Sequence, residues 1–320
     1  METTIKNSYR VGDGKTFLEP SALNTLPSIV AQDHLPRLSD RYEFIDTMGI
    51  VNLLAGEGWM PVLAQEQRIR SLDRQGFQKH LVRFREVNRP IPATVDGISP
   101  EIILTSSHDG LNAWNLFAGF IKWLCLNGLV VSSGLFAAIR IKHFGHHGDQ
   151  IIEATRRIAN EMPGLLDQVN TYQRITLEPI ERQIFAESAL ITRFAPSQSD
   201  EVILPAPNDV HMVINGRTFL TNRLLAPKRA SESDPGYANT LWGTFNTVQE
   251  NLIRGNGFEK TIRTDDHGGI RIKRKVKGVS AINENLRVNR GLWHLMDEMA
   301  RQKGHEAVTR ISDQHDLETV

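Results

Sequence analysis

A histidine-rich turn is the first segment whose residue types suggest chemistry. Three histidines and an aspartate stand close together in it: His143, His146, His147 and Asp149. Imidazole and carboxylate groups are common ligands of zinc and other divalent metals. The spacing matches no established ligand pattern, and neither a helical His-x-x-x-His pair nor a thiolate accompanies it. We therefore interpret the segment as a solvated turn, expect no metal and no cofactor, and regard His143 as a packed, hydrogen-bonded residue.

The second segment, Ser107-His108-Asp109-Gly110, holds the three residue types of a hydrolytic triad. Adjacent side chains of an extended chain point apart, so the histidine cannot lie between the serine and the aspartate. A tight turn explains the pattern better: Asp109 closes an Asx-type hydrogen bond and Gly110 supplies backbone freedom. A candidate functional loop after a strand is the alternative. A metal-dependent hydrolase or nuclease using His108, Asp109 and His143 is the least favoured hypothesis.

The third segment is a run of five cations without an acidic residue, from Arg271 to Lys277. Between Arg254 and Arg290 ten basic residues oppose four acidic ones, although the formal net charge of the whole protein is zero. Glycines flank the run, which predicts a mobile loop or hairpin over residues 255–279. Phosphate backbones favour clustered Lys and Arg through counterion release; a solvated loop is the alternative. We predict that the nucleic-acid-binding residues are Arg271, Lys273, Arg274, Lys275, Lys277, Arg287 and Arg290.

The elements that position these segments are first strands and later helices. Alternating apolar residues predict strands over 60–70, 79–87, 101–106 and 135–142, and helical spacing predicts a helix over 47–57. The apolar stretch around Trp114–Cys125 fits either a buried helix or a strand followed by a helix. Farther along, the spacing predicts helices from residue 149, over 179–195, from 237 to 254 and over 282–302, with an irregular segment over 195–221.

This order predicts an α+β fold, with an antiparallel sheet in the N-terminal half packed with helices and a mainly helical C-terminal half. The expected organisation is an irregular leader (1–40), an α+β core domain (41–195), a helical region (196–303) that contains the basic segment, and a flexible tail (304–320). No Gly-rich strand-to-helix turn of dinucleotide or P-loop type is present, which argues against nucleotide-dependent chemistry.

Composition limits the class of protein and the cellular compartment that we expect. The 320 residues are 40% hydrophobic and 23% charged, a globular balance. Cys125 is the single cysteine, so an internal disulfide is excluded, and its apolar surroundings indicate a buried residue. The N-terminus is polar and the longest apolar stretch falls short of a membrane span. We expect a cytoplasmic protein without a membrane partner. An oligomer is compatible with these observations.

Four blocks of the chain, in order, resemble a known family. They are Pro100–Leu104 leading into Ser107–Gly110; Cys125–Val130; Leu241–Thr244 with Gln249–Leu252; and Leu286–Trp293. The chain is similar, over about Leu38 to Arg301, to the YafZ/YfjQ/YubP-like family of prophage and plasmid proteins, which carries a domain of unknown function. His143 fits the family pattern, whereas His146 and His147 lie in an apparent insertion, which weakens the metal hypothesis further.

The resemblance implies an accessory role on a mobile genetic element, in DNA metabolism, recombination or interference with host defence. Together with the basic segment, it favours a non-enzymatic DNA-associated protein of the single-strand-binding, annealing or recombination kind. The alternative partner is a host defence protein, such as a nuclease or restriction complex that the chain blocks.

Overall fold

The computed structural model describes ten stretches of the chain: residues 9–39, 42–69, 72–88, 98–122, 128–130, 139–141, 148–206, 209–255, 259–264 and 270–305. These form two compact units, the first ending at Pro163 and the second beginning at Gly164. Helix α2 (Gly148–Arg174) contributes residues to both. Within the described stretches, no helix is both long and apolar enough to cross a membrane.

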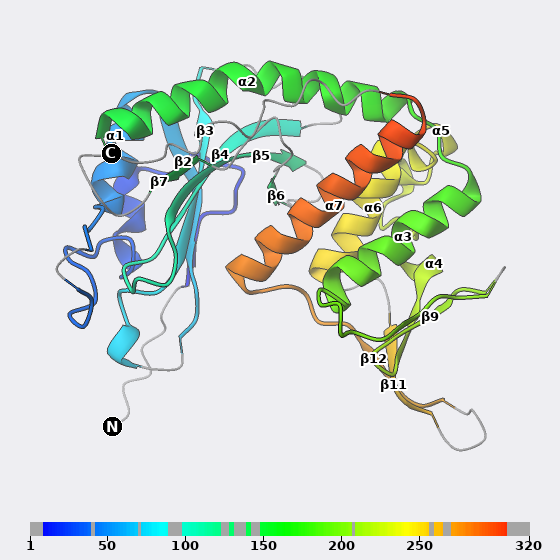
Figure 1. The fold of residues 1–320 in the computed structure, drawn as a ribbon. Coiled ribbons are helices and arrows are strands. Elements are labelled where there is room, and N and C mark those ends of the chain that lie inside the picture. The colour runs from blue at the N-terminus through cyan, green and yellow to red at the C-terminus, as the bar shows by residue number, and fades with distance from the viewer. Residues whose placement is uncertain are drawn as a thin grey trace. The chain divides into compact units, whose positions relative to one another are not determined.

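Unit 1 is built on an antiparallel sheet (Figure 1). Its strands follow the order β1-β2-β3-β4-β5-β6, with β7 paired to β5. The strands are β1 (Arg10–Val11), β2 (Trp59–Glu66), β3 (His80–Glu86), β4 (Ile98–Ser106), β5 (Trp114–Lys122), β6 (Gly128–Val130) and β7 (Ile139–Ile141). Helix α1 (Thr47–Gly56) and the short 3-10 turns η1 (Pro20–Thr25) and η2 (Leu72–Arg74) accompany the sheet.

The central strands of this sheet are buried along nearly their whole length. Every residue of β4 is buried, as are six of the seven residues of β3. The buried set includes charged groups: the Glu101 carboxylate accepts from Arg83 Nε at 2.5 Å and from Arg85 Nη2 at 2.6 Å. Arg85 also donates to the backbone carbonyls of Gly14 and Lys15 at 2.8 and 3.1 Å. Because the carboxylate is shared by two guanidinium groups, its burial is compensated.

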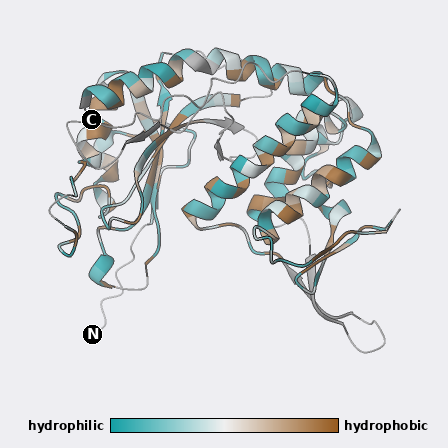
Figure 2. Cartoon of the chain, viewed as in Figure 1, coloured by the Kyte–Doolittle hydropathy of each residue, from teal (hydrophilic) through white to brown (hydrophobic). Residues whose placement is uncertain are grey.

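Unit 2 is mainly helical. Its helices are the last part of α2, α3 (Pro179–Phe194), α4 (Thr221–Leu224), α5 (Pro235–Ala238), α6 (Leu241–Arg254) and α7 (Ile282–Gln302), with the 3-10 turn η3 (Ala230–Glu232). Residues 241–253 of α6 are all buried, which makes this helix the centre of the unit. Trp242 stacks on Phe245, and Phe245 meets Phe185 of α3 and Trp293 of α7 edge-on. The hydropathy of α3 and α7 alternates along the helix (Figure 2), as expected of helices that bury one face.

A second sheet belongs to unit 2, with the strand order β12-β11-β10-β9-β8. The strands are β8 (Val202–Ile203), β9 (His211–Ile214), β10 (Arg217–Leu220), β11 (Glu259–Thr264) and β12 (Ile270–Lys275). The prediction that residues 195–221 are irregular is therefore wrong. The sequence holds the missed signal, since Asn215-Gly216 joins β9 to β10 with positive φ at both residues (48° and 68°), which is typical of a tight hairpin.

The predicted α+β class is confirmed, with the antiparallel sheet in the N-terminal half and helices mostly in the C-terminal half. Of the two alternatives for the apolar stretch after the Ser107 turn, the strand is correct over Trp114–Lys122. The predicted helices over 47–57, 179–195 and 282–302 correspond to α1, α3 and α7.

Candidate functional site

The predicted basic segment forms the two outer strands of the unit 2 sheet. Strands β11 and β12 pair as an antiparallel hairpin, which extends beyond α3, α6 and α7 in Figure 1. Of the predicted phosphate-binding residues, Arg271, Lys273, Arg274 and Lys275 lie on β12. Lys277 follows the strand and is exposed. Of the two predicted forms, loop or hairpin, the structure has the hairpin.

In the register of this basic hairpin, acidic residues rarely stand opposite basic ones. Its two strands contain six basic residues and one acidic residue. Lys260 is paired with Arg274, and Lys273 with Thr261, while Lys275 alone stands opposite a carboxylate, Glu259. Like charges at directly opposite positions destabilise an antiparallel pair. The pairing of Lys260 with Arg274 places two like charges at opposite positions of the hairpin.

The root of the basic hairpin is fixed to the end of α6. Gly255 ends the helix with φ +70°, and a Cβ there would lie 2.3 Å from the Val276 carbonyl oxygen. The Val279 amide donates to the Ile253 carbonyl at 2.7 Å, which joins the strand exit to the last helical turn. Only glycine permits so close a backbone approach in a left-handed conformation. The hairpin is thus held at its base by short backbone contacts.

Arg193 at the end of α3 adds a second attachment at this root. Its guanidinium donates to the Leu252 carbonyl and, at 2.6 Å, to the Lys277 carbonyl. Burial lowers the pKa of Arg193 to about 10, which leaves it charged at neutral pH. The sequence pattern did not identify Arg193, because its partners are carbonyls that carry no side-chain signal.

The two predicted helical cations have partners within the protein. Arg287 forms an ion pair with Glu284 at 2.6 Å and donates to the carbonyls of Thr192 and Arg193 at 2.6 and 3.2 Å. It thereby satisfies carbonyls at the C-terminus of α3, as basic residues often do. Arg290 is partly buried, and this burial lowers its pKa. The contacts of Arg287 assign it a role in holding α7 to α3.

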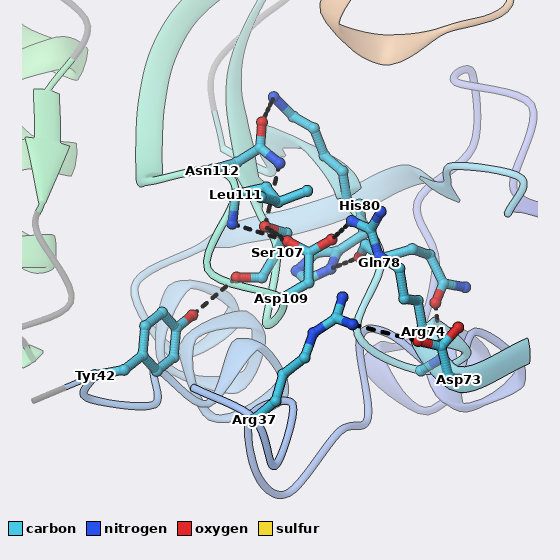
Figure 3. A network of polar contacts seen from close by, with 12 residues as sticks. Arg37, Tyr42, Asp73, Arg74, Gln78, His80, Ser107, Asp109, Leu111 and Asn112 are labelled. Carbon is cyan, nitrogen blue, oxygen red and sulfur yellow. Dashed lines mark hydrogen bonds and ion pairs between the residues drawn. The ribbon is translucent and has the colours of Figure 1, made fainter. Parts of the chain in front are cut away.

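The Ser107–Gly110 segment is a closed turn between β4 and β5 (Figure 3). Ser107 Oγ donates to Asp109 Oδ1 at 2.7 Å, and the Leu111 amide donates to the same oxygen at 3.1 Å. Gly110 has φ +75°. Arg74 forms an ion pair with Asp109. The predicted Asx-type turn is confirmed. The serine hydroxyl is hydrogen-bonded directly to the Asp109 carboxylate, with no general base between them.

The ring of His108 is buried near two other rings. Its centroid is 4.7 Å from Phe44 and 5.1 Å from His80. His80 Nε2 lies 2.9 Å from the Thr47 hydroxyl. Burial, and then the neighbouring His108, lower the pKa of His80 well below its usual value, so it is neutral at pH 7. The two imidazoles are packing groups of the buried sheet end.

Two further titratable groups border the turn. Lys79 Nζ lies 3.4 Å from Asn112 Oδ1, and burial lowers its pKa to about 8 despite the charge of Asp109. Tyr42 donates to the Ser107 carbonyl at 3.0 Å, and burial, followed by the Asp109 charge, raises its pKa. Tyr42 thus connects the segment before α1 to the turn, and Lys79 connects the start of β3 to it. The contacts of the turn are therefore structural.

The predicted histidine turn and the single cysteine fall largely outside the described stretches. His143, His146, His147 and Cys125 are among the residues without a described position, whereas Asp149 is exposed in the first turn of α2. Among the described residues, no group of three or more His, Cys, Asp and Glu side chains is placed to hold a metal ion. The metal hypothesis on this turn stays untested by the geometry.

Comparison with known proteins gives a family and two relatives. A family model described as a domain of unknown function (DUF932) matches residues 34–293. UPF0380 protein YafZ of Escherichia coli K12 is 29% identical over 281 residues, covering 87% of this chain and 89% of the relative. UPF0380 protein YfjQ of the same strain is 27% identical over 277 residues, with the same coverage. No solved structure matches significantly.

Proposed function

This chain belongs to the DUF932 family, a domain of unknown function, and from its own residues we propose that it binds DNA through the basic hairpin β11–β12, without catalysing a reaction. The role we propose is that of an accessory protein of a mobile genetic element, acting in single-strand binding, annealing or recombination. The observation that supports it is the register of the hairpin, in which most basic positions lie opposite basic or neutral ones and Lys275 alone lies opposite an acidic residue, Glu259.

Counterion release supplies the physical reason for this proposal. Each phosphate neutralised by Lys or Arg makes binding more sensitive to salt, with a slope of log K against log salt of about −0.9 per contact on duplex DNA. The protein has no net charge, so attraction to DNA has to come from a local surface. The basic hairpin is such a surface, and its root is held by Gly255 and Arg193.

A competing structural explanation exists for the same charges. β12 is the last strand of the described sheet, and edge strands are commonly protected from aggregation by lysine. Edge protection requires charge but no particular partner, so it predicts no salt-dependent DNA binding. It predicts instead that removal of the charges causes association of the protein with itself.

The test is a mobility shift with single-stranded and duplex DNA across a salt series. The variant replaces Arg271, Lys273, Arg274, Lys275 and Lys277 with alanine. The control variant removes Arg37 and Arg156, exposed arginines of unit 1 that each lie 3.5 Å from a carboxylate. We expect the hairpin variant to bind more weakly, with a salt slope shallower by up to about 4.5 on duplex DNA, and the control to bind as the wild type does.

Unchanged affinity in the hairpin variant, or wild-type affinity that salt does not alter, would refute the DNA proposal. The alternative, a protein that blocks a host nuclease or restriction complex, is examined by capture from host lysate after nuclease treatment. A partner that persists without nucleic acid, together with no mobility shift, would replace DNA binding by that alternative.

A further inference from the structure

The C-terminal end of α6 brings three exposed basic residues from separate segments to the root of the basic hairpin. Arg254 is the last residue of α6, and its side chain is 39% exposed. Arg223 on α4 is exposed, and its carbonyl accepts from Asn251 of α6 at 3.4 Å. Lys277, also exposed, has its carbonyl carbon 2.4 Å from the position of a Cβ on Gly255. All three backbones therefore lie within about one helical turn of the same helix end.

The acidic groups at this helix end are already engaged with arginine. Glu250 accepts from Arg229 at 2.7 and 3.0 Å, and Arg229 also donates to both carboxylate oxygens of Glu232 at 3.1 Å. Arg254 Nη1 lies at 3.5 Å from Glu250, a longer contact than the two that Arg229 makes. Glu250 is therefore shared by two arginines, of which Arg229 makes the shorter contacts.

Two more features favour cations here and an anionic ligand beside them. The negative end of the α6 dipole stabilises basic groups in its last turn. The adjoining hairpin carries a further excess of basic residues on strands that begin and end at this root. Charges of one sign gathered on a surface raise the local concentration of oppositely charged ligands.

We infer that the phosphate-binding surface extends from the hairpin onto the end of α6, where Arg223 and Arg254 flank Lys277. This inference rests on the proposed DNA binding and assigns to it two residues outside the basic run. The ligand is the DNA phosphate backbone: arginines of this kind position nucleic acid without reading its sequence. The hairpin and the helix end then contact successive phosphates from one fixed root.

The experiment measures the affinity for a labelled DNA duplex by fluorescence anisotropy across a salt series. It compares the double variant Arg223→Ala/Arg254→Ala with the wild type. The control is Arg37→Ala/Arg156→Ala, in which Arg156 matches Arg254 because each lies 3.5 Å from a glutamate. We expect weaker binding for the double variant and a salt slope shallower by about 2. The control should keep the wild-type slope, and Arg223→Lys/Arg254→Lys should restore it because charge, not shape, carries the contact.

Folding of the double variant is expected to be retained. Glu250 keeps both bonds to Arg229, and the contact of Arg223 with Asn251 uses the backbone. A wild-type slope in the double variant, alongside a reduced slope in the hairpin variant, overturns the extension and leaves the proposed DNA binding intact. Absence of salt-dependent binding in the wild type refutes the proposed function, and the extension with it.

Discussion

Replacement of Asp297 by asparagine should stabilise unit 2 at neutral pH. Asp297 of α7 is buried, with 5% of its surface exposed, and accepts hydrogen bonds from Tyr172 and, at 2.8 Å, from Gln168, both on α2. Burial raises its pKa from 3.8 to about 6, although Tyr172, His294 and Arg301 favour the charged form. The folded protein therefore has to hold a carboxylate that its surroundings disfavour.

The sign and size of this effect follow from proton linkage. The folded-state pKa is raised, so the energetic cost is absent below the unfolded value and grows as pH rises from about 4 to about 6. Each pH unit between the two values corresponds to about 1.4 kcal/mol, so at pH 7.5 the ionised group costs unit 2 about 3 kcal/mol. Asparagine keeps an accepting oxygen and removes the charge.

The assay is native-state hydrogen exchange of α2 and α7 peptides at pH 4.5 and 7.5, since a two-unit chain need not unfold in one step. Asp297→Asn should raise protection by up to about 3 kcal/mol at pH 7.5 and by only about 1 kcal/mol at pH 4.5. The control is Glu298→Gln on the same helix, whose carboxylate is 37% exposed and pairs with Arg301; we expect a change below about 1 kcal/mol. Equal stability of Asp297→Asn and wild type at pH 7.5 would show that the carboxylate is not disfavoured.

Three further variants test other contacts. Glu101→Ala leaves Arg83 and Arg85 buried without their shared carboxylate, so unit 1 should lose about 3–5 kcal/mol in urea unfolding; a loss below 1 kcal/mol would contradict the buried pair. Because the pKa of His80 is lowered in the folded state, its contribution to stability is lost as pH falls below 6.5. His80→Gln should therefore flatten the acid slope of β3 hydrogen exchange, and an unaltered slope would refute this. Gly255→Ala should cost more than about 1 kcal/mol by thermal unfolding, because of its positive φ and its close backbone contacts. Gly56→Ala, with open space around its Cβ, should be neutral or stabilising, and similar effects of the two would contradict the close approach.

The spacing of apolar residues was sufficient to predict helices and strands that depend on their own local sequence. Strand β3 and helix α7 follow from alternating and helical spacing of apolar residues, and the predicted ranges differ from the structure by a few residues at most. The hairpin β9–β10 was not predicted, because the prolines elsewhere in residues 195–221 were given more weight than the turn signal Asn215-Gly216. The burial of Arg83 and Arg85 could not be predicted from local sequence, because the carboxylate between them lies on another strand.

The candidate site shows the same division between local and tertiary causes. The charge of residues 271–277 was visible in the sequence, and so was the turn chemistry of Asp109 and Gly110. Helical spacing also placed Arg287 on the basic surface, but its guanidinium is bound to carbonyls at the end of α3. Arg223 and Arg254 lie on separate helices, and Asn251 of α6 connects the two segments by donating to the carbonyls of Arg223 and Leu224.

The arginines described above differ in their contacts, and this difference bears on the proposed DNA-binding surface. Where a carboxylate or an unpaired helix carbonyl lies within reach, as for Arg83 and Arg287, the guanidinium is bound within the protein and adds stability. In the β11–β12 register, most basic positions lie opposite no acidic residue. Close contacts at Gly255 then hold its root in place. For the proposed DNA binding, a root that is fixed in advance lowers the entropic cost, because less of the surface has to be ordered when the ligand arrives.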